Sequence, residues 1–543
     1  MTLADSILWS FARSALIAGV ALWPVAVLLR QMAASRTVRT RRVWLLLAVF
    51  PFFVPELLIG FNYRLTATQL SSGASPVVAA ICTESLYALL QLVRCVAVGV
   101  ALSLLLPRSE VTREAMYSWD LLRPLSKHDW RRGWFWLRLT GPWQPMLISW
   151  SIMALITFQE FETAALMQID RHPVAWSVWL FDAHAARQPL TDSLRMIVVP
   201  LLCELLLLAP ALILLLRLQG CSSLTGELPT EDLSAPAAPR GHRGILAAIM
   251  LCPGVLFFLL WPMLANIVPT VNGLLSMLRG TLLKQSALHI LTSTAFAAAS
   301  TFIAMSAAVV IFTSHRVYPG GSTAFCATAV GSTSGMSTSA EAVKPLGQAR
   351  WRLNHNRGGY TSYAAAVVTI LPGLLGSLVL SLTLLAAFQT SPLRPLYDTW
   401  LPMLLGQSLA VLPRALAVVL LLRKTTDIAA IHSARMLTSS IDSERRRAAS
   451  SILWRLTTGR WLLGSLVIAH WCFWDVTVAS ILRPVQLEPV VTRLYNEMHY
   501  GRTEALMSLA VLAALTPLIV AGCAMVFSRV IYSRLGIPAR RAT

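Results

Sequence analysis

The sequence predicts an all-α polytopic membrane protein with about eleven, or twelve, transmembrane helices in two parallel-repeat halves. Of its 543 residues, 56% are hydrophobic and only 13% are charged, which is about half the charged share of a soluble domain. Apolar runs of about 20 residues recur along the chain, and each is long enough to cross the hydrocarbon of a bilayer. The net charge of +20 is concentrated in alternate loops, as expected for a multi-pass protein.

The apolar runs predict eleven spans, which are 7–29, 43–61, 80–106, 143–164, 195–216, 244–267, 287–312, 360–388, 400–421, 459–480 and 504–529. The first run has neither a basic leading region nor a clear cleavage site, so we interpret it as a retained helix rather than a signal peptide. A leading twelfth helix in the first half would give six spans in each half.

The halves are separated by a stretch rich in Ser, Pro, Gly and acidic residues, which has no apolar periodicity. Such a stretch is typical of a flexible linker. The predicted organisation is therefore a first half at 1–216, a cytoplasmic linker at 217–243 and a second half at 244–543.

The distribution of Lys and Arg predicts the orientation. If the loop at 30–42 is cytoplasmic, the loops on its side hold about 31 basic residues, against about 9 on the other side. Positive charge placed in this way accounts for the basic composition without a nucleic-acid partner, and it predicts contact with membrane lipid.

A short phrase is repeated in the two halves. The first copy is WFWLRLTGPW at 134–143 and the second is LWRLTTGRW at 453–461. Both copies follow a basic loop and lead into an apolar span, and both lie on the predicted cytoplasmic side. The repeated loops therefore predict parallel rather than inverted repeats, with a pathway at their interface.

Acidic residues recur just beyond these phrases, in FQEFETAALM at 158–167 and FWDVTVASIL at 473–482. A buried acid in a span costs a few kcal/mol unless it meets water or a partner. One interpretation is a wet translocation pathway that attracts a cation, and the other is a set of interfacial acids satisfied by solvent. The candidate pathway residues are Glu160, Glu162, Asp475 and Thr477.

Three arginines, Arg13, Arg94 and Arg414, also lie within apolar runs. Such arginines either extend toward the membrane surface or pair with acids inside the membrane. We favour structural pairing, for which the candidate partners are Glu56, Glu84 and Glu204.

The loops before the repeated phrases carry a further pattern. The first loop has Glu114 and Ala115 and is followed by Pro142; the second contains IHSARMLTSS at 431–440, and the chain later reads LYNEMHYG at 494–501. These residues resemble the inner-membrane permease of binding-protein-dependent ATP-binding cassette (ABC) importers, in its fused two-domain form and closest to the iron(III)-type branch.

The resemblance implies that each loop contains a coupling helix, which docks in a cleft of a separate ATPase subunit. The residues that match these coupling positions are Glu114, Ala115, Met116, Pro142, His432, Ser433, Ala434 and Gly459. Some of them depart from the family pattern, since His432 stands at the family's Glu position and Met116 at its second Ala. Thr438 replaces a Gly, and a β-branched residue adopts the positive φ of such a turn poorly.

The function that the resemblance implies is a transmembrane permease subunit of an ATP-driven importer for a small solute, with iron(III) implied by the branch. The implied partners are two copies of an ABC ATPase subunit, docked on loops 107–142 and 422–458, and an extracytoplasmic solute-binding protein. The implied location is a bacterial-type cytoplasmic (inner) membrane. The departures in the loops keep open an ATPase-independent secondary transporter or membrane scaffold.

The sequence gives no indication of an enzyme. None of its lysines follows a glycine, so the phosphate loop G-x-x-x-x-G-K-[ST] is absent. If ATP drives transport, we expect a partner chain to hydrolyse it. The eight cysteines include no C-x-x-C pair, and no His cluster appears. We therefore expect no cofactor or metal on this chain.

Overall fold

The computed structural model describes residues 2–35, 37–72, 74–106, 134–135, 137–139, 141, 143–168, 175–186, 189–218, 240–278, 282–314, 371–424, 428–438, 442–500 and 503–535. Within these residues the protein is 90% helical and has no strands, so the predicted all-α class is confirmed. Most of the predicted linker, at 219–239, lies outside the described residues.

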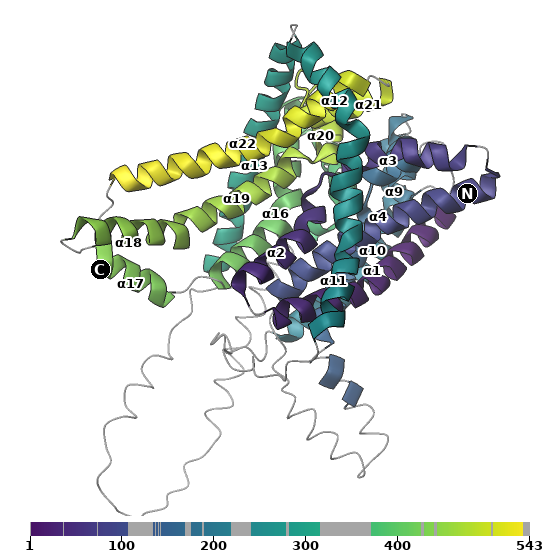
Figure 1. The fold of residues 1–543 in the computed structure, drawn as a ribbon. Coiled ribbons are helices and arrows are strands. Elements are labelled where there is room, and N and C mark those ends of the chain that lie inside the picture. Colours follow the sequence, from purple (N-terminus) through teal and green to yellow (C-terminus); the bar gives the residue numbers. More distant parts are fainter. Residues whose placement is uncertain are drawn as a thin grey trace, which may run out of the picture.

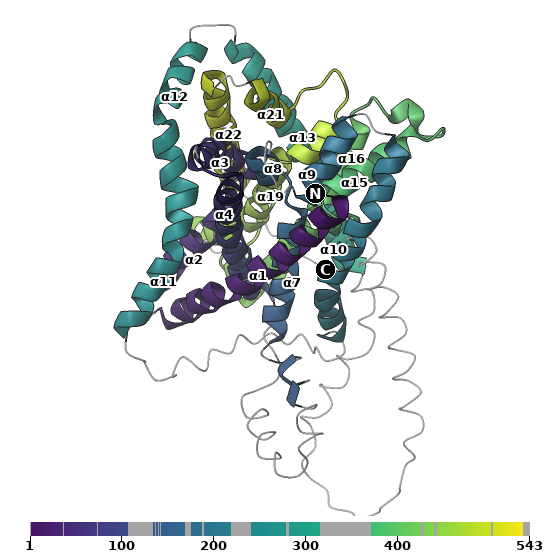
Figure 2. The same ribbon diagram turned by 90° about the vertical axis from the view of Figure 1, so that its right-hand side faces the viewer.

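The first half contains α1 (Leu3–Ala34), α2 (Val38–Val49), η1 (Phe50–Phe53), α3 (Glu56–Ser71), α4 (Pro76–Leu105), α7 (Gln144–Gln159), α8 (Glu162–Gln168), α9 (Trp176–Ala185) and α10 (Leu190–Leu218). The second contains α11 (Arg240–Val255), η2 (Leu256–Leu260), α12 (Trp261–Leu278), α13 (Leu282–Ser314), α15 (Ser377–Gln389), η3 (Arg394–Leu396), α16 (Leu401–Lys424), α17 (Ile428–Thr438), α18 (Ser443–Leu456), α19 (Thr458–Phe473), α20 (Val476–Leu482), α21 (Val490–Tyr500) and α22 (Thr503–Leu535). Figures 1 and 2 show their arrangement.

Seven helical stretches in the described residues are long and apolar enough to cross a membrane. They lie in α1, α4, α10, the continuous path α11–η2–α12, α13, α16 and α22, and each coincides with a predicted span. The chain is therefore a multi-pass membrane protein. The total of eleven or twelve spans stays a prediction, because the described residues give seven spans, or up to nine if each bent pair is one span, and part of the predicted span 360–388 lies outside them.

Two further predicted spans, 43–61 and 459–480, are broken helices. The path through α2 and η1 bends by 77° into α3, and the path through α18 and α19 bends by 55° into α20. The span predicted at 143–164 is also interrupted, since α7 ends at Gln159 and α8 begins at Glu162. Hydropathy identified these stretches as apolar but did not indicate that the helix axis changes.

Helices far apart in sequence pack in matching combinations. In the first half α1 packs against α4 and α7, α4 against α7, and α3 against α8; in the second half α13 packs against α16 and α19, α16 against α19, and α15 against α20. Small residues allow the close approaches. A Cβ added to Gly99 of α4 would lie 2.7 Å from Val25 of α1 and 2.8 Å from the sulfur of Met153 in α7.

The long path α11–η2–α12 runs along the outside of both halves (Figures 1 and 2). Its π-turn η2 is followed by Pro262, which has no N–H to donate to the carbonyls of the preceding turn. Tyr63 of α3 donates its hydroxyl to the freed carbonyl of Phe257 at 2.9 Å. This hydrogen bond holds η2, in the middle of the path α11–η2–α12, against α3 of the first half.

Candidate functional site

Helix breaks from both halves meet at one place. Helix α3 begins at Glu56 after Pro55, α8 begins just after Glu160, and α20 begins after Asp475. A fourth helix, α15, begins after Gly376, whose φ of 79° is the left-handed conformation that favours glycine. The break after α7 lies about 24 Å along that helix from its start at Gln144, by helical rise.

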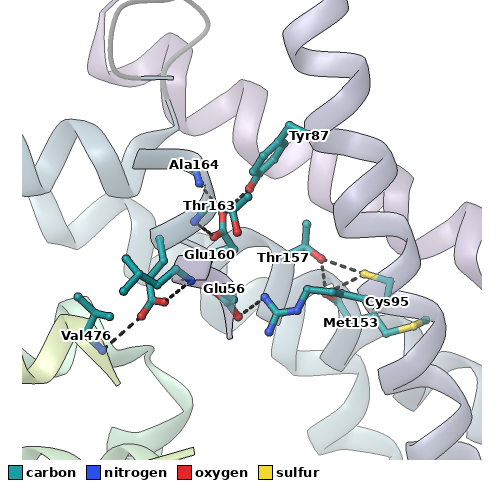
Figure 3. Close-up of polar contacts among 12 residues, drawn as sticks. Glu56, Tyr87, Cys95, Met153, Thr157, Glu160, Thr163, Ala164 and Val476 are labelled. Carbon is teal, nitrogen blue, oxygen red and sulfur yellow. Dashed lines mark hydrogen bonds and ion pairs between the residues drawn. The ribbon is translucent and has the colours of Figure 1, made fainter. Parts of the chain in front are cut away.

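Glu160 caps the break within the first half (Figure 3). Its carboxylate accepts the hydroxyl of Tyr87 at 2.7 Å and the backbone N–H groups of Thr163 and Ala164 at 2.5 and 3.2 Å. The side chain is only 4% exposed. A carboxylate in this position satisfies N–H groups of α8 that have no partner within the helix.

Glu162 connects the two halves. One carboxylate oxygen accepts the backbone N–H of Leu57, at the start of α3, at 3.1 Å. The other accepts the N–H of Val476, the first residue of α20, at 3.3 Å, and Figure 3 shows Val476 on the ribbon of the second half facing this cluster. One side chain thus joins the N-termini of two broken helices, where a negative charge is favoured.

Asp475 and Glu56 are also partnered. Asp475 is the N-cap of α20 and accepts the N–H of Val478 at 3.0 Å. Glu56 forms an ion pair with Arg94 of α4. All four acids at the breaks therefore have partners within the protein. Glu160, Glu162 and Asp475 accept hydrogen bonds, and Glu56 forms an ion pair.

The predicted pairing of the arginines within apolar runs holds for two of them. Arg13 of α1 pairs with Glu84 of α4 at 2.8 Å, and Arg94 pairs with Glu56. Glu204, the third acid named, is 1% exposed on α10 and forms no ion pair within the described residues.

Arg414 of α16 differs from the other two arginines. Its guanidinium lies over the ring of Trp471, 5.4 Å from the ring centroid, and its side chain remains exposed. The neighbouring surface is aromatic, because Phe53 stacks on Trp471 with ring centroids 5.8 Å apart. His470 adds a polar contact between the halves, with Nε2 2.9 Å from the carbonyl oxygen of Phe53.

Of the predicted pathway residues, the structure brings Glu160, Glu162 and Asp475 to the convergent breaks. Thr477 lies there too, in the first turn of α20, and is 4% exposed. Sequence reasoning assigned Glu56 only to ion pairing. Its place after Pro55 inside an apolar run was a signal, since proline interrupts a helix and an acid is favoured in the first turn of the helix that follows.

The predicted coupling residues fall into three groups. Glu114, Ala115, Met116 and Pro142 lie outside the described residues. His432 and Ser433 are exposed on α17, whereas Ala434 is 3% exposed and packs inward. Gly459 is buried at the start of α19, where an added Cβ would lie 3.1 Å from the ring of Trp454.

The described residues contain no group of three or more His, Cys, Asp and Glu side chains arranged to hold a metal ion. Chemically, the site offers anchored carboxylates and helix N-termini, with the exposed Arg414 on the neighbouring helix α16. Neither a protein-family model, a curated protein nor a solved structure matches this chain.

Proposed function

We propose that this protein is the transmembrane permease subunit of an ATP-driven importer, in which two halves of one chain form a pathway for a small solute. The observation that carries the proposal is the meeting of broken helices from both halves at Glu162, which accepts N–H groups from α3 and α20. Broken helices inside a membrane are tolerated where they are buried in protein or line a cavity, and transporters place their substrate sites at such breaks.

The packing of the helices supports two parallel repeats. Helices α1, α3, α4, α7 and α8 have the same mutual neighbours as α13, α15, α16, α19 and α20. The two sets occur in the same order along the chain. In this proposal the repeats move relative to one another, and their contact at the breaks opens and closes the pathway.

Helix α17 supports a role in coupling to an ATPase. It is an eleven-residue helix between α16 and α18, in the loop that the positive-inside pattern places in the cytoplasm. Met436 is 66% exposed and Leu437 48% exposed, beside the exposed His432. An exposed apolar helix face of this kind suits docking into a groove of a partner.

The family resemblance adds the remaining parts of the proposal. Two ATPase subunits would dock on the cytoplasmic loops, and a solute-binding protein would deliver the solute from outside a bacterial-type inner membrane. Iron(III) is implied by the branch of the family alone. The competing function, an ATPase-independent carrier or scaffold, is favoured by His432 and Thr438 at coupling positions where the family has Glu and Gly.

The test is affinity purification of the tagged protein in a mild detergent from its native host, with mass spectrometry of the proteins that co-elute. We expect an ABC ATPase with the wild-type chain, and at least tenfold less of it with Met436→Glu. The matched control is Arg455→Gln, a charge change on the exposed face of the neighbouring helix α18. If no ATPase is recovered even after cross-linking, the importer proposal is wrong and the ATPase-independent function replaces it.

A further inference from the structure

Helix α10 carries an acid that the convergent breaks do not involve. Glu204 is 1% exposed, and neither of its carboxylate oxygens has a hydrogen-bond partner within the described residues. The acids at the breaks differ in this respect, because Glu160, Glu162 and Asp475 all accept backbone N–H groups. A negative charge on Glu204 would therefore be buried with no donor among the described residues to stabilise it.

Glu204 also lies deep within a membrane span. By helical rise it is about 21 Å along α10 from Leu190, the first residue of that helix. The span Thr191–Leu214 is the most apolar of the seven. Leu202 and Leu206, which lie on nearly the opposite side of the helix from Glu204, are 60% and 64% exposed. The acid is therefore on the inward face, and its side chain is too short to reach the membrane surface.

The inward face of α10 packs on α7, and two hydrogen bonds fix how the helices align. The hydroxyl of Ser151 in α7 donates to the carbonyl of Leu207. The amide of Gln144, at the other end of the contact, donates to the carbonyl of Leu214 at 3.3 Å. Residue numbers rise along one helix as they fall along the other, so the two run antiparallel. Extended by about two turns, this alignment brings Gln159, the last residue of α7, beside the turn of α10 that precedes the buried acid.

The carboxyl group of Glu204 leans toward Gln159, because a helical side chain points back toward the N-terminus of its helix. The amide of Gln159 is also the hydrogen-bonding side chain that acts on Glu204. Gln159 in turn reaches the second half. Its Nε2 donates to the carbonyl oxygen of Leu374 at 2.6 Å, and a Cβ added to Gly376 would lie 3.0 Å from its Cδ. Glu204 is thus separated from the start of α15 by one side chain.

No charged side chain on the helices around Glu204 compensates for it within the described residues. Helices α7 and α15 contain no titratable residue. The other helices with substantial contacts to α10 are α1 and α9. Together with α10 they carry the described titratable side chains of Asp5, Arg13, Arg30, Asp182, His184, Asp192, Arg195 and Cys203. Of these, only the thiol of Cys203 interacts with Glu204, and a thiol is uncharged at neutral pH.

We infer that Glu204 is a proton-binding site, occupied by a proton while α7 is in contact with the second half. An ionised carboxylate without donors or a counter-charge is too costly to bury in an apolar interior, so such a group takes up a proton instead. A protonated carboxyl group is a donor, and the amide oxygen of Gln159 is an acceptor. The neutral pair can therefore form a hydrogen bond without placing a charge inside the membrane.

Gln159 links the proton to the contact between the two halves. While Glu204 is neutral, the amide nitrogen of Gln159 keeps its hydrogen bond to Leu374. An ionised Glu204 would draw that nitrogen toward itself, because a hydrogen bond to a carboxylate is about twice as strong as a neutral one. Loss of the proton would then weaken the contact of α7 with the segment before α15. Separation of the halves, in turn, would admit the water that carries the proton away.

This proton site goes beyond the proposed importer function. ATP hydrolysis on a partner chain requires no proton site within the membrane, whereas a carrier driven by a proton gradient requires one. Proton binding at Glu204 adds a protonation step to the movement of the repeats, whichever of the two functions the chain performs.

The experiment is infrared difference spectroscopy of the full chain in a maltoside detergent at neutral pH, with the wild-type protein measured against Glu204→Gln. The carbonyl stretch of a protonated carboxyl group is separate from the bands of carboxylates and of the backbone, so the spectrum reports the protonation state directly. We expect the wild-type protein to show a protonated carboxyl band that Glu204→Gln lacks. Asp192→Asn, on the same helix with its side chain 46% exposed, is the matched control and should keep the band. Loss of a carboxylate band in Glu204→Gln, with no change in the protonated region, would overturn the inference.

The dependence of stability on pH gives a second readout. The unfolded chain exposes Glu204 to water, where it is ionised at neutral pH, so the folded protein binds one more proton than the unfolded chain. Its stability then falls as pH rises, by up to about tenfold in the folding equilibrium for each pH unit. Glu204→Gln cannot titrate, so we expect its thermal midpoint to rise relative to that of the wild-type protein between about pH 5 and pH 8, and Asp192→Asn to show no such trend. A difference between Glu204→Gln and the wild-type protein that stays constant with pH would contradict a bound proton.

Gln159→Leu keeps the test decisive if Glu204→Gln does not fold. Leucine has a similar size but no amide, so the protonated carboxyl band should move toward the position of a carboxyl group without a hydrogen bond. An unmoved band would remove Gln159 from the site, and a wild-type protein without any protonated carboxyl band would overturn the inference. These measurements need neither a solute nor an ATPase, so their failure refutes the proton site alone. Failure to recover an ATPase on purification refutes the importer function and leaves the proton site standing.

Discussion

Replacing Glu162 by glutamine should loosen the contact between the two halves. The carboxylate accepts N–H groups from Leu57 and Val476, one in each half. Glutamine is nearly isosteric, but it keeps only one acceptor oxygen and no charge. A hydrogen bond to a charged group contributes about 1.5–3 kcal/mol. Loss of one, partly offset by weaker repulsion between the acids, gives about 2 kcal/mol, or roughly thirtyfold weaker association.

The assay measures association of the halves directly. A protease site inserted into the predicted linker 217–243 lets the purified protein be cut after it has folded. A tag on the first half then captures the second half across a series of urea concentrations. We expect the second half of Glu162→Gln to be released at lower urea than that of the wild-type protein.

Glu160→Gln is the matched control. Glu160 carries the same charge two residues away, but Tyr87, Thr163 and Ala164 all belong to the first half. This variant should lower the thermal stability of the protein and leave release of the second half unchanged. Equal release from Glu162→Gln and the wild-type protein would refute the assigned bridging role, as would earlier release from Glu160→Gln alone.

Three further predictions concern stability, each checked by thermal unfolding in detergent. Gly99→Val should cost about 1–3 kcal/mol because its added atoms meet α1 and α7, whereas Gly522→Ala, with nothing within 4 Å of the new Cβ, should not lower the midpoint. Glu84→Gln should cost about 3 kcal/mol because it leaves its buried arginine partner unpaired, and replacing that arginine by glutamine as well should restore part of the loss. Ala434→Glu should lower the midpoint by burying a charge, while Met436→Glu, on the exposed face of the same helix, should leave it unchanged.

Hydropathy predicted the membrane spans well where the helix is straight. The spans in α1, α4, α10, α13, α16 and α22 all appear as expected, because an apolar run of about 20 residues has few alternatives in a bilayer. The same measure could not find the bends of 77° and 55°. An average over a window contains no information on the direction of the helix axis.

The candidate site was also predicted only in part, because the sequence shows which residues are unusual but not what they contact. Glu160 and Asp475 drew attention because acids are rare in apolar runs and these two recur in both halves. Their partners could not be predicted, because the N–H groups that Glu160 and Asp475 accept become available only where α8 and α20 begin, and hydropathy does not locate those breaks. The exposed state of Arg414 also depends on packing between α16 and α19, which a single sequence does not specify.

The packing of α11 has a consequence for how the protein is made. This helix begins the second half, yet it packs against α1, α2 and α4 of the first, while α12 continues from it onto α22. The first half therefore leaves the ribosome, still attached through the nascent chain, before the helix that covers this flank has been synthesised. Until α11 inserts, the flank faces lipid, and the nascent first half is a natural client for an insertase or chaperone. Biogenesis as well as transport then constrains the order of the helices, since moving α11 to a later point in the chain would prolong that exposure.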